Sequence, residues 1–216
     1  MYKFLKTISH LIASLIAIIC LNFWNIFDYV KFIPEEYRYD TGVTIYFSIA
    51  EILIGYVLIA IKKKCFADIE VIVKDSKSAK TKGDLLYNPT IVLDNQFGLS
   101  EFTINIKVNG SYDNLKNVKI CIPHNHLSTM QIDLHRDYVL MDENNDCNVM
   151  LDKWLDNSSK YIESNISFKI SLIKDVDDTN ETMKVEPECK YIKNNLRRFL
   201  INFKKNYMTL QVERSR

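Results

Sequence analysis

Two long apolar runs dominate the first sixty residues of the chain. They cover roughly Ile8–Val30 and Val43–Ile61, and a short polar turn separates them. A run of about 18 or more apolar residues can cross a bilayer as a helix, because a helix satisfies its own backbone polar groups. The second run carries a single charge, Glu51. The pattern predicts a transmembrane α-hairpin over residues 1–64, with spans at about 8–30 and 43–61.

The first run also has the charge pattern of a secretory signal, because Lys3 and Lys6 precede it. No small-residue cleavage pattern follows it. The bulky Ile19 before Cys20 does not fit a lipoprotein cleavage site. We therefore expect this run to be retained as a membrane span.

Lysine placement predicts the orientation of the hairpin. Lys3 and Lys6 lie before the first span and Lys62–Lys64 follow the second, whereas the turn at Lys31–Gly42 has more acidic than basic residues. Positive residues near the ends of spans favour the cytoplasmic side. We therefore expect a protein that crosses the bacterial inner (cytoplasmic) membrane twice, with both termini in the cytoplasm.

Each span has one face that is not apolar. Small and polar residues recur there at helical spacing, namely Thr7, His10, Ser14, Ala17, Asn25 and Asp28 in the first span and Thr44, Ser48, Glu51 and Gly55 in the second. Such faces are typical of membrane helices that pack closely. We therefore expect homo-oligomers. The residues expected to act in the membrane are Glu51, Ser48, Thr44, Gly55 and Asn25.

Glu51 is the most informative residue of the hairpin. A carboxyl near mid-bilayer usually faces a bundle interior or a water-filled cavity, and desolvation favours its neutral form. We expect no basic partner for it in the first span, because that span has no Lys or Arg at this depth and His10 lies nearer its cytoplasmic end. Three roles remain open: hydrogen bonding between helices, a ring of Glu51 side chains lining a pore, and a proton or ion relay.

After Lys62 the hydrophobic pattern changes to short strands. Apolar and polar residues alternate in Phe66–Lys74, Phe102–Val108 and Ile166–Ile173. Further strands are expected at Thr90–Leu93, Val118–Ile122, Met130–Leu134, Tyr138–Met141, Met183–Val185, Lys190–Ile192 and Met208–Val212. Short strands at this spacing predict an all-β cytoplasmic domain over residues 66–216, either an antiparallel sandwich or a small barrel.

An immunoglobulin-like sandwich is the preferred form of this domain. Phe102–Ile122 has the pattern of two consecutive strands of one sheet, with Asn109-Gly110 as the hairpin turn. Leu196–Phe203 has apolar residues at 196, 199, 200 and 203, which is a helical period, so we expect one C-terminal helix.

Signatures of chemistry are absent from the sequence. The chain has no Walker loop and no G-x-S-x-G, G-x-G-x-x-G or H-E-x-x-H motif, so we expect no enzyme, cofactor or metal site. The histidines at 124, 126 and 135 lack a carboxylate or Cys at ligand spacing, and the acidic loop from Asp142 has Cys147 where a calcium loop needs Gly. The net charge of +1 steers the chain toward neither nucleic acid nor anionic lipid.

Local clusters of basic residues are the remaining binding candidates. Lys77, Lys80 and Lys82 share one loop. The expected C-terminal helix and its end carry Arg197, Arg198, Lys204 and Lys205. The ordinary interpretation of such clusters is a solvated face. The alternative is a site for an anionic ligand, such as a nucleotide or nucleic acid.

In layout, with a hairpin at 8–61 and a β-rich region at 66–216, the chain resembles the two-transmembrane effectors of bacterial anti-phage systems, namely those of cyclic-oligonucleotide signalling operons and of retrons. It departs from the former because Phe66–Lys74 lacks a Gly-x-Trp element. The resemblance implies hairpins that oligomerise and permeabilise the membrane. It also implies a trigger, either a nucleotide second messenger or a protein or nucleic-acid partner encoded by the same operon. The alternatives are a membrane-anchored binding, immunity or accessory subunit, and a membrane enzyme with an unrecognised site.

Overall fold

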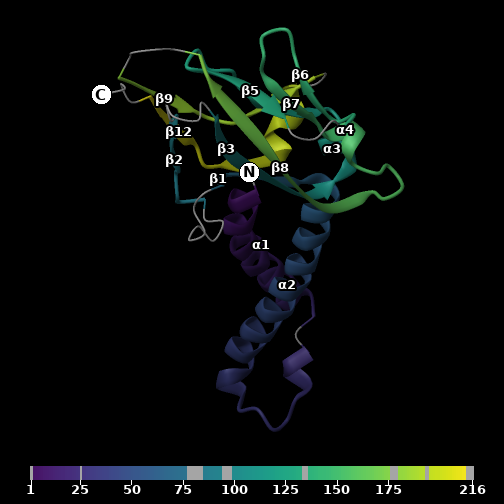
Figure 1. Ribbon diagram of the computed structural model, residues 1–216. Helices are drawn as coiled ribbons and strands as arrows, with labels where there is room; N and C mark the ends of the chain where they lie inside the picture. The colour runs from purple at the N-terminus through teal and green to yellow at the C-terminus, as the bar shows by residue number, and fades with distance from the viewer. Residues whose placement is uncertain are drawn as a thin grey trace. The chain divides into compact units, whose positions relative to one another are not determined.

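The computed structural model describes residues 2–24, 26–76, 85–93, 99–132, 136–175, 180–192 and 195–212. The chain divides into two compact units, Met1–Lys63 and Lys64–Arg216. The first unit is helical and the second is mostly β (Figure 1).

The first unit is a helical hairpin. Helix α1 covers Tyr2–Phe23, the 3₁₀ helix η1 covers Ile26–Tyr29, and helix α2 covers Glu35–Cys65. Both long helices are long and apolar enough to cross a membrane. Their bounds differ from the prediction: α1 ends at Phe23 rather than near Val30, and α2 begins before Val43.

The early start of α2 has a local cause. Pro34 directly precedes the helix and its carbonyl accepts a hydrogen bond from the Tyr37 amide (N···O 3.0 Å). Proline at a helix start loses no helical hydrogen bond, and Glu35 and Glu36 in the first turn favour the positive end of the helix dipole. These residues were assigned to the turn because they are polar, but they are good helix starters.

The second unit is built from short strands. They are β1 (Ala67–Asp75), β2 (Thr90–Leu93), β3 (Leu99–Ser111), β4 (Val118–Ile122), β5 (Ser128–Ile132), β6 (Val139–Met141), β7 (Cys147–Met150), β8 (Tyr161–Lys174), β9 (Glu181–Val185), β10 (Glu188–Tyr191), β11 (Ile201–Lys205) and β12 (Met208–Val212). Its short helices are α3 (Tyr112–Leu115), α4 (Leu151–Trp154) and the 3₁₀ helix η2 (Asn195–Leu200).

Three sheets surround one core in this unit. Their strand orders are β11-β1-β3-β8-β5, β10-β4-β7-β6 and β2-β12-β9. Neighbouring strands are antiparallel, except that β1 pairs with β11, and β2 with β12, in parallel. Buried side chains from all three sheets form a single hydrophobic cluster. The architecture is therefore β-sandwich-like, as the sequence predicted in outline.

The central strands confirm the predicted alternation. On β3, Phe102, Ile104 and Ile106 are fully buried, and they lie opposite Ile170, Phe168 and Ile166 of β8. Side chains paired in this way meet on one face of the sheet, and each buried side chain of this size contributes about 1.5–3 kcal/mol to stability. The strongest sequence pattern thus forms the centre of the core.

The predicted hairpin turn at Asn109-Gly110 is wrong. Gly110 lies inside β3, where it pairs with Ala67 on one side and Ile162 on the other. It has φ +141°, and a Cβ built on it would lie 2.4 Å from the Phe66 carbonyl oxygen. The glycine is needed for this close approach, not for a turn. Strands β3 and β4 consequently belong to different sheets, with α3 between them.

The expected C-terminal helix at Leu196–Phe203 is also wrong in part. The 3₁₀ helix η2 ends at Leu200, and Ile201–Lys205 form β11, which pairs in register with Ala67–Val71 of β1. Tertiary pairing has therefore overridden a local helical period.

Candidate functional site

A polar pair connects the two long helices of the hairpin. The imidazole Nδ1 of His10 lies 2.8 Å from Oε1 of Glu51. The expectation that Glu51 has no basic partner in the first span is therefore wrong, because His10 reaches it. The turn between two antiparallel helices sets their register, and the sequence does not give the geometry of that turn. A second link comes from the Tyr46 hydroxyl, which donates to the Trp24 carbonyl (2.7 Å).

The pair is only partly covered by the hairpin itself. The side chains of His10 and Glu51 are 59% and 44% exposed, respectively. The residues flanking Glu51 on α2, Ile52 and Leu53, are exposed and apolar, as a lipid-facing surface requires. A polar pair therefore opens onto the side of an otherwise apolar hairpin.

The faces buried within the hairpin differ from the predicted ones. On α1 the buried residues are Ser9, Ala13, Ala17 and Leu21, of which only Ala17 belongs to the predicted polar face. On α2 they are Gly42 and Ala50. Most of these are small residues, which permit close approach of membrane helices. Most residues of the predicted polar faces are therefore not among the residues buried in the hairpin.

Of the other residues predicted to act in the second span, Thr44 and Ser48 are exposed and Gly55 is partly exposed. The hydroxyls of Thr44 and Ser48 donate to the carbonyls four residues earlier, Asp40 (2.9 Å) and Thr44 (2.8 Å). A Cβ built on Gly55 would meet no atom within 4 Å. These three positions share the predicted helix face with Glu51, and among the described residues no contact with α1 accounts for them. Asn25 lies outside the described residues.

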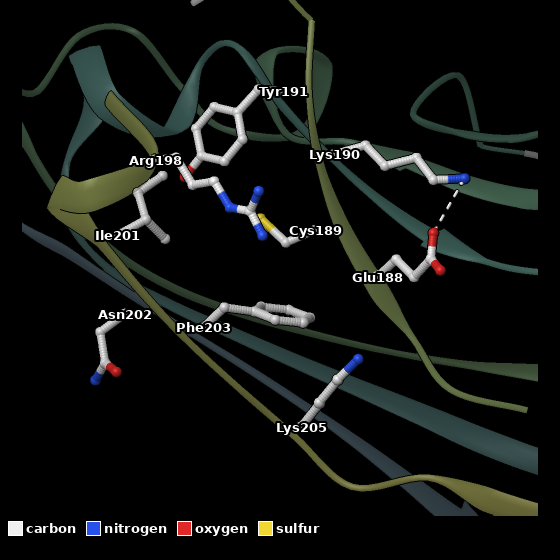
Figure 2. Close-up of a pocket in the computed structure, with 9 residues that line it drawn as sticks. All are labelled: Glu188, Cys189, Lys190, Tyr191, Arg198, Ile201, Asn202, Phe203 and Lys205. Atoms are coloured by element: carbon white, nitrogen blue, oxygen red, sulfur yellow. Dashed lines mark ion pairs between the residues drawn. The ribbon is translucent and has the colours of Figure 1, made fainter. Parts of the chain in front are cut away.

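The second candidate site is a pocket in the β unit. It lies beside β10 and β11, which are the end strands of two different sheets, and η2 borders it. The pocket has a volume of about 970 Å³. Figure 2 shows the side chains that line it, which are Glu188, Cys189, Lys190, Tyr191, Arg198, Ile201, Asn202, Phe203 and Lys205.

Four side chains of β11 line the pocket, and the alternation along the strand sets how deeply each one is buried. Ile201, Phe203 and Lys205 are partly buried, whereas Asn202 and Lys204 between them are exposed. Ile201 and Phe203 also pack against the hydrophobic core. Part of the pocket lining is therefore apolar and continuous with the core, beside charged and polar side chains.

Two of the three cations at the pocket are already paired. Lys205 Nζ lies 3.1 Å from Glu186 Oε1, and Lys190 Nζ lies 3.2 Å from Glu188 Oε2. The lysines beside Glu186 hold the pKa of its carboxyl below the usual range, Lys205 first and then Lys184. Within the described part of the chain, no carboxylate pairs with Arg198. Arg198 is therefore the cation that a ligand would meet.

The groups nearest Arg198 remain uncharged at neutral pH. Burial raises the pKa of the Cys189 thiol to about 11, against a smaller opposing effect of Arg198. Burial also raises the pKa of the Tyr191 phenol above its ordinary range, and the nearby Cys189 adds to this rise. Neither group supplies a negative charge near pH 7.

The structure separates the four basic residues predicted as anionic-ligand contacts. Arg198 and Lys205 both line the pocket, whereas Lys204 does not. The Arg197 side chain lies outside the described residues. The prediction missed most of the contribution of β10, namely Glu188, Cys189 and Lys190. No sequence signal brings Glu188–Tyr191 next to 198–205, because that contact depends on which sheet edges meet.

The histidine and acidic segments have structural roles in this unit. The Asp146 carboxylate accepts from the His124 amide (2.7 Å), and the Asp142 carboxylate accepts from the Asn148 side-chain amide (2.8 Å). Across the described ranges, no group of three or more His, Cys, Asp or Glu side chains could hold a metal ion. His135 lies outside those ranges, as do Lys77, Lys80 and Lys82.

Comparisons with known proteins give distant structural likenesses alone. No protein-family model and no curated protein matches the chain. A type I cohesin from Pseudobacteroides cellulosolvens is similar at 8% identity and a TM-score of 0.33, over 70% of this chain and 94% of the cohesin. The acetylcholine-binding protein of Bulinus truncatus is similar at 11% identity and a TM-score of 0.24, over 66% of each chain. The N-terminal domain of PorA is similar at 12% identity and a TM-score of 0.23, over 67% of this chain and 97% of that domain. Likenesses of this size assign neither a family nor a function.

Proposed function

We propose that this protein is a membrane-anchored effector of a bacterial anti-phage defence system. Its hairpin crosses the inner membrane with both termini in the cytoplasm, and its immunoglobulin-like β domain senses a ligand or an operon-encoded partner. Sensing shifts the population of the protein toward an oligomer in which the hairpins permeabilise the membrane. The layout, a minimal hairpin followed by one β-rich domain, is what the resemblance to such effectors rests on.

The observation that carries the proposal is the half-exposed pair of His10 and Glu51. Ionisable groups within a membrane are costly unless they face other helices or water. The lone hairpin leaves about half of each side chain uncovered. A second hairpin would cover the pair, and a water-filled pore would solvate it. Either arrangement favours assembly over the isolated hairpin.

The pocket in the β unit supports the sensing half of the proposal. Arg198, for which the described residues supply no carboxylate partner, lines it together with apolar side chains such as Phe203, which suits a small anionic ligand. A ligand shifts an equilibrium only when it binds one state better than the other. The proposal therefore requires the pocket to have a higher affinity for its ligand in the assembled state.

Membrane potential in expressing bacteria tests the proposal directly. High expression favours the oligomer by mass action, even when the natural trigger is absent. We expect the full-length chain to depolarise the membrane, as recorded with a potential-sensitive dye. Glu51→Leu should abolish depolarisation at equal expression, whereas the matched change Ile52→Leu should not. Depolarisation that persists in both variants would remove Glu51 from the mechanism.

A second candidate is a membrane-anchored binding, immunity or accessory subunit without pore activity. The specific observation in its favour is that His10 and Glu51 satisfy each other within one chain. The contact between the two side chains would then only stabilise a hairpin that anchors the protein in the membrane. In that case Glu51→Leu leaves function intact, no depolarisation occurs at any expression level, and cross-linking through Ser48→Cys gives no dimer.

A further inference from the structure

We propose that the His10–Glu51 pair relays protons, so that assembled hairpins pass protons through the membrane and exclude hydrated metal cations. This inference rests on the proposed function, because it names the ion that the assembled hairpins carry. Proton entry down the membrane potential depolarises a cell, as the proposed function requires.

The pair has the geometry of a proton-transfer contact. His10 Nδ1 and Glu51 Oε1 are 2.8 Å apart, which is within the range over which one side chain passes a proton to another. Each group has a second atom that can exchange a proton, Nε2 on the imidazole and Oε2 on the carboxyl. About half of each side chain is exposed. A proton can therefore enter at one group and leave from the other.

The transfer returns both groups to their starting charge. A low-dielectric environment favours two neutral groups, with the carboxyl Oε1–H donating to Nδ1. Transfer of this proton makes an imidazolium beside a carboxylate. The imidazolium then releases its Nε2 proton, and the carboxylate takes up a proton from the other side. One proton has entered and one has left, and the ring regains its first tautomer by exchange with water.

The pair is the one charge-bearing layer along the two spans. His10 is the only His, Lys, Arg, Asp or Glu between Lys6 and the end of α1. Glu51 is the only such side chain between Asp40 and the lysines at the end of α2. A ring of carboxylates alone would attract metal cations. Here each carboxyl is paired with an imidazole that shares its proton, so the layer does not accumulate negative charge.

The surroundings of the pair do not replace the hydration shell of a metal cation. The exposed neighbours Leu11 on α1 and Ile52 on α2 are apolar. The hydroxyls of Ser14 and Ser48 are single oxygens, and each is bonded to a backbone carbonyl of its own helix (3.0 and 2.8 Å). Cation filters instead surround the ion with rings of oxygens. Short water chains that end at an ionisable pair suit the transfer of protons.

Flux assays on the full-length protein in liposomes test this selectivity. Potassium-loaded vesicles that contain a pH dye are diluted into potassium-free buffer, at a high protein-to-lipid ratio that favours assembly. With valinomycin, potassium leaves through the ionophore and protons enter only through the protein. With a protonophore instead, protons enter freely and potassium leaves only through the protein. We expect acidification to be at least roughly tenfold faster with valinomycin than with the protonophore.

Glutamine variants separate proton transfer from helix packing. His10→Gln and Glu51→Gln each retain a side chain that can hydrogen-bond across the hairpin but cannot pass on a proton. Both should lower the valinomycin-dependent proton flux by at least roughly tenfold. Ile52→Leu, an exposed neighbour of Glu51, should leave this flux unchanged. Cross-linking and circular dichroism of each variant show whether a lower flux reflects a loss of assembly or of fold.

Two results would overturn the relay and leave the proposed function standing. The first is equally fast acidification of wild-type vesicles with either ionophore, which would indicate an aqueous pore. The second is a proton flux that is unchanged in both glutamine variants. An absence of flux with either ionophore, from vesicles in which cross-linking shows oligomers, would overturn the proposed function together with the relay.

Discussion

A buried asparagine of the β unit and a polar pair of the hairpin find their hydrogen-bond partners in opposite ways. In the β unit, the buried Asn206 side chain is fully engaged, since it accepts from the Val73 amide (2.7 Å) and donates to the Val73 and Tyr87 carbonyls (both 2.8 Å). In the hairpin, His10 and Glu51 bond to each other and remain half exposed. Asn206 is therefore satisfied within its own unit, whereas the His10–Glu51 pair would, in our proposal, be covered by a membrane assembly of several copies.

The largest expected difference in stability is between alanine substitutions of one glycine in each unit, Gly110 in the β unit and Gly55 in the hairpin. Gly110→Ala places a Cβ 2.4 Å from Phe66 O and 2.5 Å from Ala67 Cα, at a φ of +141°. Backbone atoms cannot yield without breaking the β1–β3 ladder, so we expect a loss of about 4 kcal/mol or more, or no folded β unit. Gly55→Ala meets no atom within 4 Å and should change stability by about 1 kcal/mol at most, in the favourable direction.

Urea unfolding of the full-length protein in nanodiscs, followed by circular dichroism, measures both glycine variants. Equal stabilities of the Gly110→Ala and Gly55→Ala proteins would contradict the close approach of β1 and β3.

Removal of the Asn206 hydrogen bonds is expected to have the next largest effect on the free energy of unfolding. Asn206→Leu leaves the Val73 amide and two buried carbonyls without this partner, and each unsatisfied buried group costs about 1–3 kcal/mol. We expect a loss of roughly 3 kcal/mol in the free energy of unfolding. Asn202→Ala removes an exposed contact to Asp68 and should cost less than about 0.5 kcal/mol. Similar losses in the two variants would show that the Asn206 network is not buried in solution.

Local pattern explains most of what the sequence predicted correctly. The bounds of β2, β4 and β12 match the prediction residue for residue, because period-two alternation is a property of a few adjacent positions. Gly110 and Ile201–Lys205 were misassigned because pairing with β1 imposes both conformations. Ala67, the β1 partner of Gly110, lies more than forty residues before it, and β1 lies more than a hundred residues from β11. A pattern over a few adjacent residues does not indicate which distant segments of the chain pair as strands.

The two candidate sites were predictable only in part, for the same reason. Glu51 stood out as a single charge in an apolar run, but its contact with His10 depends on helix register. Arg198 and Lys205 were identified as members of a local cluster of basic residues. The pocket itself needs β10 to lie beside β11, and these strands belong to different sheets.

A double-mutant cycle on His10 and Glu51 has a smaller expected effect. Hydrogen bonds between membrane helices are worth about 0.6 kcal/mol on average and up to about 1.7 kcal/mol. We expect the effects of His10→Leu and Glu51→Leu on the free energy of unfolding to be non-additive by about this amount, measured on the full-length protein in nanodiscs. His10→Leu combined with Ile52→Ala should be additive within about 0.5 kcal/mol, because Ile52 is exposed. Additivity in both cycles would show that the His10–Glu51 contact does not form.

The smallest effect that we predict is a pH dependence in the acidic loop of the β unit. The pKa of Asp142 is lowered, first by the hydrogen bond from the Asn148 side chain and then by the Asp146 and Asn144 amides. A carboxyl whose folded-state pKa is depressed adds stability above its unfolded pKa, about 3.9, and loses that stability as pH falls through the folded value. The wild-type protein should therefore have a higher unfolding midpoint than Asp142→Asn at pH 6. The difference between the two midpoints should narrow as the pH falls below about 4. Asp152→Asn, an exposed carboxyl on α4, should show a much smaller gap. A pH-independent gap for Asp142→Asn would mean that these amide contacts stabilise the loop without depending on the charge of the carboxylate.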